Sequence, residues 1–201
     1  MLAMRLYNSM VSGNCYKVRL VCAQLGLDLE LHELDVVDRS NRPEVIGALN
    51  PALRVPTLVL DDGRPLAESN AIIDFLADGT PLLPDDPYDR ARVLAWQFFE
   101  QYEIEPNLAV VRFYAIFGLT APPGLVEART SAGVRALQAL ERGLDDRRFL
   151  IADRYSVADV SLYAYVHVAG EGGFDLTGFP NVEAWLARVA EQPGHIPITQ
   201  A

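Results

Sequence analysis

The segment from Leu53 to Phe75 constrains the fold most, because its pattern predicts two short strands, a tight turn between them and a helix after them. Pro56 precedes the β-branched and apolar run Thr57–Leu60. A proline donates no backbone hydrogen bond, so it belongs at the first residue of a strand or at a sheet edge. Asp62 and Gly63 form a strong hairpin signal. We therefore expect a β-hairpin that leads directly into a helix.

The polar pair Glu68 and Ser69 stands where that helix is expected to begin. A helix N-terminus presents backbone amide donors and the positive end of a dipole, which together bind an anion such as a carboxylate. Glu68 could accept a hydrogen bond from a ligand ammonium, and the backbone of Val55 could pair with an extended peptide as an added strand. We expect the Val55–Pro56 bond to be cis, which turns the Val55 amide and carbonyl toward a ligand. The segment thus predicts a pocket for an amino-acid end and a peptide bond.

The chain before this segment predicts alternating strands and helices. The expected elements are a strand at Arg5–Asn8, a helix from Cys15 that stops at Gly26, a strand at Leu29–Val36 and a poorly patterned helix at Pro43–Leu49. The order β-α-β-α-β-β-α is that of a thioredoxin-like domain. We place this domain at residues 1–77.

Residues 78–87 contain three prolines and a glycine, a composition typical of a linker. Residues 88–201 predict an all-helical second domain. Its expected helices are Tyr88–Phe117 with an interruption at Glu105-Pro106, Pro122–Asp145, Val157–Val168 and Asn181–Glu191. The fold class is therefore α/β plus all-α.

A capping box is expected where the helix after Ser156 begins. Asp159 can reach back to the Ser156 amide, and Tyr155 with Val160 could form a hydrophobic staple. We assign this group a structural role.

Composition excludes several function classes. The net charge of −10 over 201 residues argues against nucleic acid or an anionic membrane as a partner, because such binding needs clustered Lys and Arg. No apolar run approaches the 18 residues needed to span a bilayer. Cys15 and Cys22 would lie roughly 10 Å apart along one helix, too far for a disulfide, and three scattered histidines suggest no metal site. We expect a soluble, cytoplasmic protein.

The run Asn50–Leu58, followed by Glu68-Ser69, resembles the glutathione-binding signature of the cytosolic glutathione transferase family. Phe149-Leu150 and Ala158-Asp159 resemble the buried capping box of the same family. The resemblance implies that the Val55 backbone, before cis-Pro56, pairs with the cysteinyl part of glutathione. It also implies that Glu68 and Ser69 hold the γ-glutamyl end. The family often has a cationic or amide side chain where this chain has Leu53, so Arg54 or Arg42 is the expected partner of the glycyl carboxylate.

The turn after the first strand holds three candidates for activating the glutathione thiol. Ser12 is similar to the serine of theta- and delta-like classes, Asn14 to a second donor in some bacterial classes, and Cys15 to the cysteine of beta- and omega-like members. We rank Ser12 first, then Cys15, then Asn14. Asn14 could instead cap the first helix. Cys15 could instead be a small buried residue, although a place in the first helical turn would depress its pKa.

The second substrate is expected beside Met10, Phe113, Tyr114 and Phe117, which offer apolar and aromatic surface. Each of them is also a candidate for the core, as is Tyr7. Arg112 could reach the thiol side or pair with a buried acid.

The resemblance implies a two-domain, homodimeric enzyme that adds glutathione to a small hydrophobic electrophile or reduces a peroxide or glutathionyl disulfide. It implies no cofactor beyond glutathione. Two alternatives are a thiol-disulfide reductase that acts through Cys15 and a non-catalytic member of the same fold.

Overall fold

The computed structural model describes residues 4–151 and 153–200. The described chain forms two compact units. Unit 1 contains residues 4–80 and 193–200, and unit 2 contains residues 81–192 apart from residue 152. Within this described part, no helix is both long enough and apolar enough to cross a membrane.

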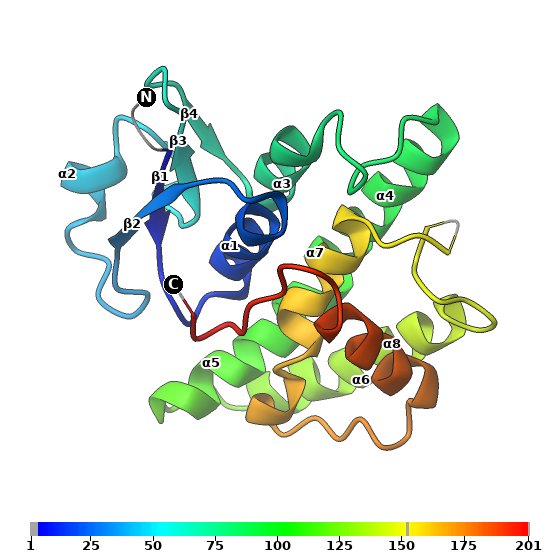
Figure 1. Cartoon of the computed structure of the whole chain (residues 1–201). Coiled ribbons are helices and arrows are strands. Elements are labelled where there is room, and N and C mark those ends of the chain that lie inside the picture. The colour runs from blue at the N-terminus through cyan, green and yellow to red at the C-terminus, as the bar shows by residue number, and fades with distance from the viewer. Residues whose placement is uncertain (1–3, 152, 201) are drawn as a thin grey trace. The chain divides into compact units, whose positions relative to one another are not determined.

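Unit 1 is built on a four-stranded sheet with the order β2-β1-β3-β4 (Figure 1). Its strands are β1 (Met4–Asn8), β2 (Leu29–Glu33), β3 (Thr57–Val59) and β4 (Pro65–Ala67). β1 pairs in parallel with β2 and antiparallel with β3, which in turn pairs antiparallel with β4. The thioredoxin-like order expected from the sequence is confirmed.

Three helices complete this part of unit 1: α1 (Gly13–Leu25), α2 (Arg42–Ile46) and α3 (Ser69–Ala77). α1 and α3 pack against each other on one side of the sheet, and α2 lies on the other side (Figure 1). Gly26 ends α1 in the left-handed conformation, with φ of 65°, as glycine does at many helix C-termini. Tyr7 is buried beside Leu34 and Ile46, which agrees with its expected place in the core.

β2 is shorter than the predicted strand Leu29–Val36. The side chain of Asp35 accepts hydrogen bonds from the amides of Val37 (2.6 Å) and Asp38 (3.0 Å). This local turn competes with strand pairing. β2 therefore ends at Glu33, at the outer edge of the sheet.

The C-terminal residues differ from the predicted domain boundary at 88–201. Residues 193–200 group with unit 1. The Tyr16 hydroxyl donates to the Ile196 carbonyl at 2.6 Å, and Arg19 Nη2 donates to the Ile198 carbonyl at 2.7 Å. Backbone carbonyls accept both bonds, so the side-chain pattern of residues 193–200 carries no signal for this pairing.

Unit 2 contains α4 (Pro87–Phe99), α5 (Val110–Phe117), α6 (Leu125–Gly143), α7 (Val157–Val166) and α8 (Pro180–Ala190). A π-helical segment joins α4 to α5 at Glu100–Ala109, and a short 3₁₀ helix follows α7 at Ala169–Gly172. All ten residues of α7 are buried. α7 is therefore the central helix of this unit.

The chain does not break at Glu105-Pro106, where the sequence predicts an interruption. It continues through the π-helical segment, which contains Pro106. Proline has no backbone N–H and its ring crowds the preceding turn, so a regular α-helix cannot pass through it unchanged. The Asn107 side chain donates to the Glu103 carbonyl at 2.7 Å. The wider turn and this side-chain bond let the helix continue.

The predicted capping box at the start of α7 is confirmed. Asp159 is fully buried and accepts from the Ser156 amide (2.9 Å), the Leu150 amide (3.1 Å) and Trp185 Nε1 (2.9 Å). Burial nevertheless raises the pKa of this carboxyl to about 6, against the lowering effect of its hydrogen bonds.

Candidate functional site

Ser12 is the N-cap of α1. Its backbone is extended, and its Oγ accepts a hydrogen bond from the Cys15 amide at 3.3 Å. The Ser12 amide donates to the Ser9 carbonyl at 3.0 Å, which closes the turn before the helix. The cap is therefore Ser12, and the alternative that Asn14 caps α1 is wrong. A serine hydroxyl that accepts from an amide still has its own proton to donate.

Asn14 and Ser69 meet through their side chains. Ser69 Oγ donates to Asn14 Oδ1 at 3.0 Å and accepts from Lys17 Nζ at 3.3 Å. The packing of α1 against α3 thus joins the start of α1, which holds the predicted thiol-activating residues, to the predicted γ-glutamyl site. Lys17 is fully buried and was not among the residues that the sequence singled out. The signal was a lysine between the apolar residues Tyr16 and Val18 of the helix, where a charge is rarely buried without a partner.

Cys15 lies at 0% exposure, with the Ser9 amide 3.4 Å from its Sγ. Burial raises the pKa of its thiol to about 11, although the Ser12 and Ser9 hydrogen bonds and the Arg19 charge act in the opposite direction. The expectation that the first helical turn depresses this pKa is therefore wrong, because desolvation outweighs those contacts. Cys22 is also buried, and burial raises its thiol pKa to about 12.

Glu68 precedes α3 with φ of 70° and ψ of 114°, and its side chain makes no capping hydrogen bond. A non-glycine residue with this φ is strained by roughly 1–3 kcal/mol, and such strain often occurs at binding sites. Glu68 is exposed, whereas the next residue, Ser69, is buried. The two residues therefore lie at the start of α3 as predicted, with the carboxylate in solvent.

The Val55–Pro56 bond is cis, as predicted. Asn50, which the sequence pointed to only as part of a motif, organises the loop that leads to it. Its side chain donates to the Arg54 carbonyl (3.0 Å) and to Thr57 Oγ1 (2.9 Å), and it accepts from the Ala52 amide (2.9 Å). The loop before the proline is thus held by one buried amide side chain.

Arg42 and Arg54, the two expected partners of a glycyl carboxylate, differ in their surroundings. Arg42 is buried, and its two Nη atoms donate to the carbonyls of Leu53 and Asp35, both at 2.9 Å. Arg54 is exposed. The Arg42 guanidinium supports the loop, so Arg54 is the better candidate for contact with a ligand.

The residues expected around a second substrate lie on both units. Met10 is half-buried in the turn after β1. On α5, Phe113 packs against Tyr114 and Phe117, with ring centroids 5.8 and 5.1 Å away, and all three side chains are half-buried. Arg112 pairs at 2.8 Å with Glu171, an acid that is partly exposed. Arg112 thus has an acidic partner, although this acid is exposed and not buried as the sequence suggested.

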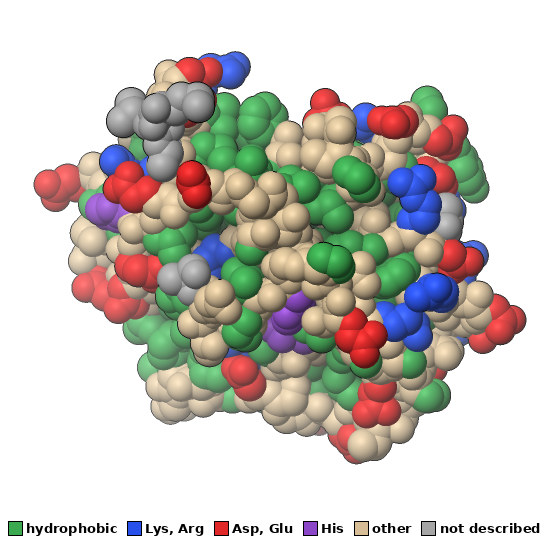
Figure 2. All heavy atoms as spheres, in the orientation of Figure 1, with side chains coloured by type: hydrophobic (Ala, Val, Ile, Leu, Met, Phe, Trp, Pro, Cys, Tyr) green, Lys and Arg blue, Asp and Glu red, His purple; other side chains and the backbone are tan. Residues whose placement is uncertain are grey.

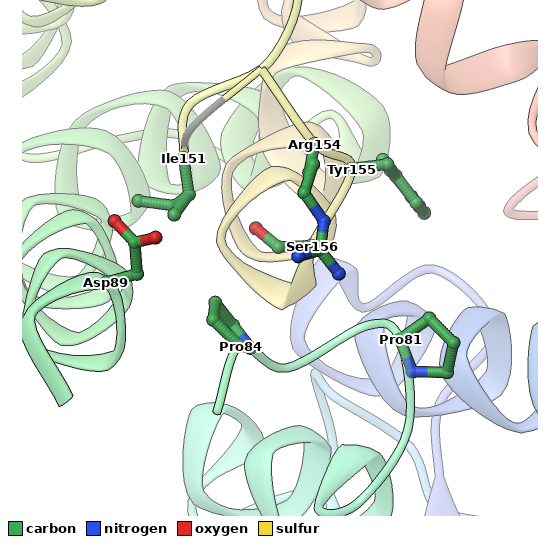
Figure 3. A pocket seen from close by; sticks show the side chains of 7 residues that line it. All are labelled: Pro81, Pro84, Asp89, Ile151, Arg154, Tyr155 and Ser156. Carbon is green, nitrogen blue, oxygen red and sulfur yellow. The ribbon is translucent and has the colours of Figure 1, made fainter. Parts of the chain in front are cut away.

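A pocket in unit 2 contains none of the predicted site residues (Figure 3). It lies at the start of α7, and the side chains of Pro81, Pro84, Asp89, Ile151, Arg154, Tyr155 and Ser156 line it. Ser156 belongs to the capping box of α7. This part of the pocket wall therefore serves the fold.

A thioredoxin-like unit with a cis-proline, followed by a helical unit, is the architecture of a glutathione transferase. The chain matches the model of the N-terminal domain of glutathione S-transferases over residues 6–82 and that of their C-terminal domain over residues 123–188. The chain belongs to the glutathione S-transferase family.

Individual relatives agree with this assignment. A crystal structure of a glutathione S-transferase from Pseudomonas fluorescens is 43% identical, with a TM-score of 0.93 over 99% of this chain and 100% of that one. Glutathione S-transferase 2 of Anopheles gambiae is 30% identical over 91% of this chain and 88% of its own length. The disulfide-bond oxidoreductase YfcG of Escherichia coli is 27% identical over 90% and 87%.

Proposed function

We propose that unit 1 binds glutathione and activates its thiol, either for attack on a small electrophile or for glutathione-dependent reduction. The enzyme is a glutathione transferase, whose class stays open. Acidic side chains are spread over the face seen in Figure 2, so binding of the anionic peptide depends on local donors. The start of α3, where the N-cap residue Glu68 makes no side-chain capping hydrogen bond, is such a place.

The γ-glutamyl end is assigned to Glu68 and Ser69. The exposed Glu68 carboxylate can accept from the ligand ammonium, and the start of α3 can bind the α-carboxylate. The Val55 backbone before cis-Pro56 pairs with the cysteinyl part, and Arg54 is the cation available to the glycyl carboxylate.

Ser12 is assigned as the donor to the glutathione sulfur, and the observation that carries this role is its place as the N-cap of α1. The Cys15 amide fixes Ser12 Oγ from one side, and the hydroxyl proton can be donated to a thiolate. Lowering a thiol pKa by about two units requires about 3 kcal/mol of preferential thiolate stabilisation. A hydrogen bond from Ser12 and the positive end of the α1 dipole can together supply stabilisation of that order.

Reduction through Cys15 is the second candidate, because one relative is named a disulfide-bond oxidoreductase. A thiol with a pKa of about 11 is ionised in only about one molecule in ten thousand at pH 7. Since the thiolate is the reactive form, we assign any reductase activity to the sulfur of bound glutathione.

The aromatic cluster of α5, Phe113, Tyr114 and Phe117, is proposed to contact the electrophile.

A cytoplasmic homodimer is also part of the proposal, and it rests on the family membership. Tyr88, Leu94, Phe98 and Tyr102 are exposed along α4 and the π-helical segment, and a row of large apolar side chains is typical of an interface. Sedimentation of the purified protein tests the dimer.

The activity test compares Ser12→Ala, Asn14→Ala and Cys15→Ser in a conjugation assay across pH. We expect Ser12→Ala to raise the apparent pKa of the reaction and to lower the rate at neutral pH. Cys15→Ser should change the rate little. A Ser12→Ala profile like that of the wild type would remove the Ser12 role, and a loss confined to Asn14→Ala would transfer it to Asn14.

A further inference from the structure

Residues 193–200, here named the C-terminal strap, lie against α1 within unit 1. The Tyr16 hydroxyl donates to the Ile196 carbonyl at 2.6 Å and lies 3.3 Å from His195 Nε2. Arg19 Nη2 donates to the Ile198 carbonyl at 2.7 Å. The strap is thus attached to α1 at two points, one helical turn apart.

Arg19 also holds the turn that carries Ser12. It is only 2% exposed. Its Nη1 donates to Asn8 Oδ1 at 2.6 Å, and its Nη2, besides the strap, donates to the Met10 carbonyl at 3.2 Å. One guanidinium therefore joins the end of β1, the following turn and the strap. Among the described residues its Nε has no partner, so the side chain is buried at a cost that its other bonds must offset.

Glu33 holds the same turn from the end of β2. Its Oε2 accepts from the Met10 amide at 3.2 Å, and its Oε1 accepts from the Asn8 side chain. Both backbone groups of Met10 are therefore fixed, the amide by Glu33 and the carbonyl by Arg19. Met10 lies two residues before Ser12, so a shift of this residue displaces the hydroxyl.

We propose that Arg19 is a positioning residue for the thiol-activating turn and that the C-terminal strap holds the Arg19 guanidinium in the geometry that this role needs. The inference rests on the proposed role of Ser12. Arg19 is not proposed to touch glutathione or the electrophile. It acts through the Met10 carbonyl and Asn8.

A different effect of Arg19 would be its charge alone. Burial lowers the pKa of its guanidinium, and the nearby Cys15, Glu33 and Tyr16 act in the opposite direction. A positive charge near the turn would favour a thiolate without any particular hydrogen-bond geometry. Arg19→Lys separates the two effects, because lysine keeps the charge and loses the planar fork of donors.

Gly194 offers a way to displace the strap while Arg19 stays in place. It has φ of 72°, and a Cβ added to it would lie 2.8 Å from Gln24 Cα and 3.0 Å from the Ala23 carbonyl oxygen of α1. Gly194→Ala must therefore move the strap away from the helix. Gly79→Ala is the matched control, because Gly79 has φ of 71° and a Cβ there meets no atom within 4 Å. Both variants carry the same backbone strain, and only one carries the clash.

The experiment measures conjugation of glutathione across pH in the full-length protein, together with thermal unfolding with and without glutathione. We expect Gly194→Ala, Arg19→Met and Arg19→Lys each to raise the apparent pKa of the reaction by about one unit. If the activated thiol has a pKa of about 6.5, that shift lowers the thiolate fraction and kcat about threefold at pH 7, and the loss approaches tenfold only well below pH 6.5. The KM for glutathione and the stabilisation by glutathione should stay within about twofold, because the start of α3 is unchanged. Gly79→Ala should behave as the wild type.

Three outcomes would overturn the proposal. They are a wild-type pH profile in Gly194→Ala, full activity in Arg19→Lys, and an equal loss in Gly79→Ala and Gly194→Ala. Failure of the proposed function looks different, because Ser12→Ala would then leave the pH profile unchanged. If Arg19→Met does not fold, Gly194→Ala and Arg19→Lys still decide the question.

Discussion

α3 and α7 both begin beside a serine and an acidic residue, yet the two helix starts are arranged in opposite ways. At α7 the acid, Asp159, is buried and its carboxylate accepts from the Ser156 and Leu150 amides and from Trp185. At α3 the acid, Glu68, is exposed, strained in φ, and caps nothing. The same residue types thus form a capping box at α7, whereas Glu68 makes no side-chain capping hydrogen bond at α3.

The difference shows how a helix N-terminus becomes available to a ligand. The first amides of a helix need acceptors, and those of α7 lie beside a carboxylate that forms part of the core. At α3 the N-cap residue Glu68 makes no side-chain capping hydrogen bond, and the proposed ligand carboxylate would accept from the amides there. If the first arrangement serves stability and the second serves binding, substitutions at Asp159 and Glu68 should have different effects.

Asp159→Ala should have the largest effect on stability. It leaves the Ser156 and Leu150 amides and Trp185 Nε1 buried without their acceptor, and we expect a loss of about 3–5 kcal/mol in the free energy of unfolding. Glu68→Ala is the control and should change that free energy by less than about 1 kcal/mol. Denaturant unfolding measures both. Equal losses in the two variants would remove the distinction between the helix starts.

The stability of the protein should also depend on pH through Asp159. Its folded-state pKa is about 6, above the unfolded value of about 3.9. The folded state therefore holds the proton more tightly, and the stability from this group is fully present below pH ~4 and is lost as pH rises through ~6. The expected loss is about 3 kcal/mol.

Asp159→Asn measures this contribution, because asparagine does not titrate. The difference between the unfolding free energies of wild type and variant should change between about pH 4 and pH 6 and stay constant above that range. If the unfolding free energies of wild type and Asp159→Asn change with pH in parallel, the Asp159 carboxyl keeps its ordinary pKa in the folded protein.

Glu68→Gly should stabilise the unliganded protein while weakening glutathione binding. Glycine adopts φ of 70° without strain, so we expect a gain of about 0.5–1 kcal/mol after the extra freedom of the unfolded chain is counted. Glu68→Ala keeps the strain and should show no gain. In the wild type, glutathione at one hundred times its Kd should raise the free energy of unfolding by about 2.7 kcal/mol. Both variants should lose most of this stabilisation, which thermal unfolding with and without glutathione measures. A normal shift in both would place the γ-glutamyl end elsewhere.

Local sequence signals predicted most of the fold. The hairpin at Asp62-Gly63, the stop of α1 at Gly26 and the capping box at Ser156 each depend on residues a few positions apart. Their conformations follow from local chemistry, and the structure agrees. The C-terminal strap was missed because a helix, through Tyr16 and Arg19, holds backbone carbonyls about 180 positions away.

The candidate site was predictable as a set of positions, and its electrostatics were not. The cis bond before Pro56 and the place of Glu68 and Ser69 at the start of α3 follow from short motifs. Whether Cys15 is reactive depends on desolvation by the rest of unit 1, which overcomes the favourable helix end. The use of Arg42 to support the Leu53 loop likewise arises only from tertiary packing.

The start of α1 is a third case beside α3 and α7, and substitution of Cys15 there should have the smallest effect on activity. Its N-terminus is capped by Ser12, and Cys15 lies in its first turn with a thiol pKa raised by burial. A mixed disulfide would form if the Cys15 thiolate attacked oxidised glutathione, bonding one glutathionyl sulfur and releasing the other as glutathione thiolate. The folded protein at pH 7 should therefore gain no glutathionyl mass over hours, whereas the unfolded chain should gain up to two groups, one at each cysteine.

Cys15→Ser should leave conjugation within about twofold of the wild type, because the reacting sulfur belongs to the ligand. An adduct on Cys15 in the folded protein, found by mass spectrometry together with loss of reductase activity in Cys15→Ser, would show that a buried thiol at a helix start can still act. That result would establish the Cys15 reductase in place of the ligand thiolate.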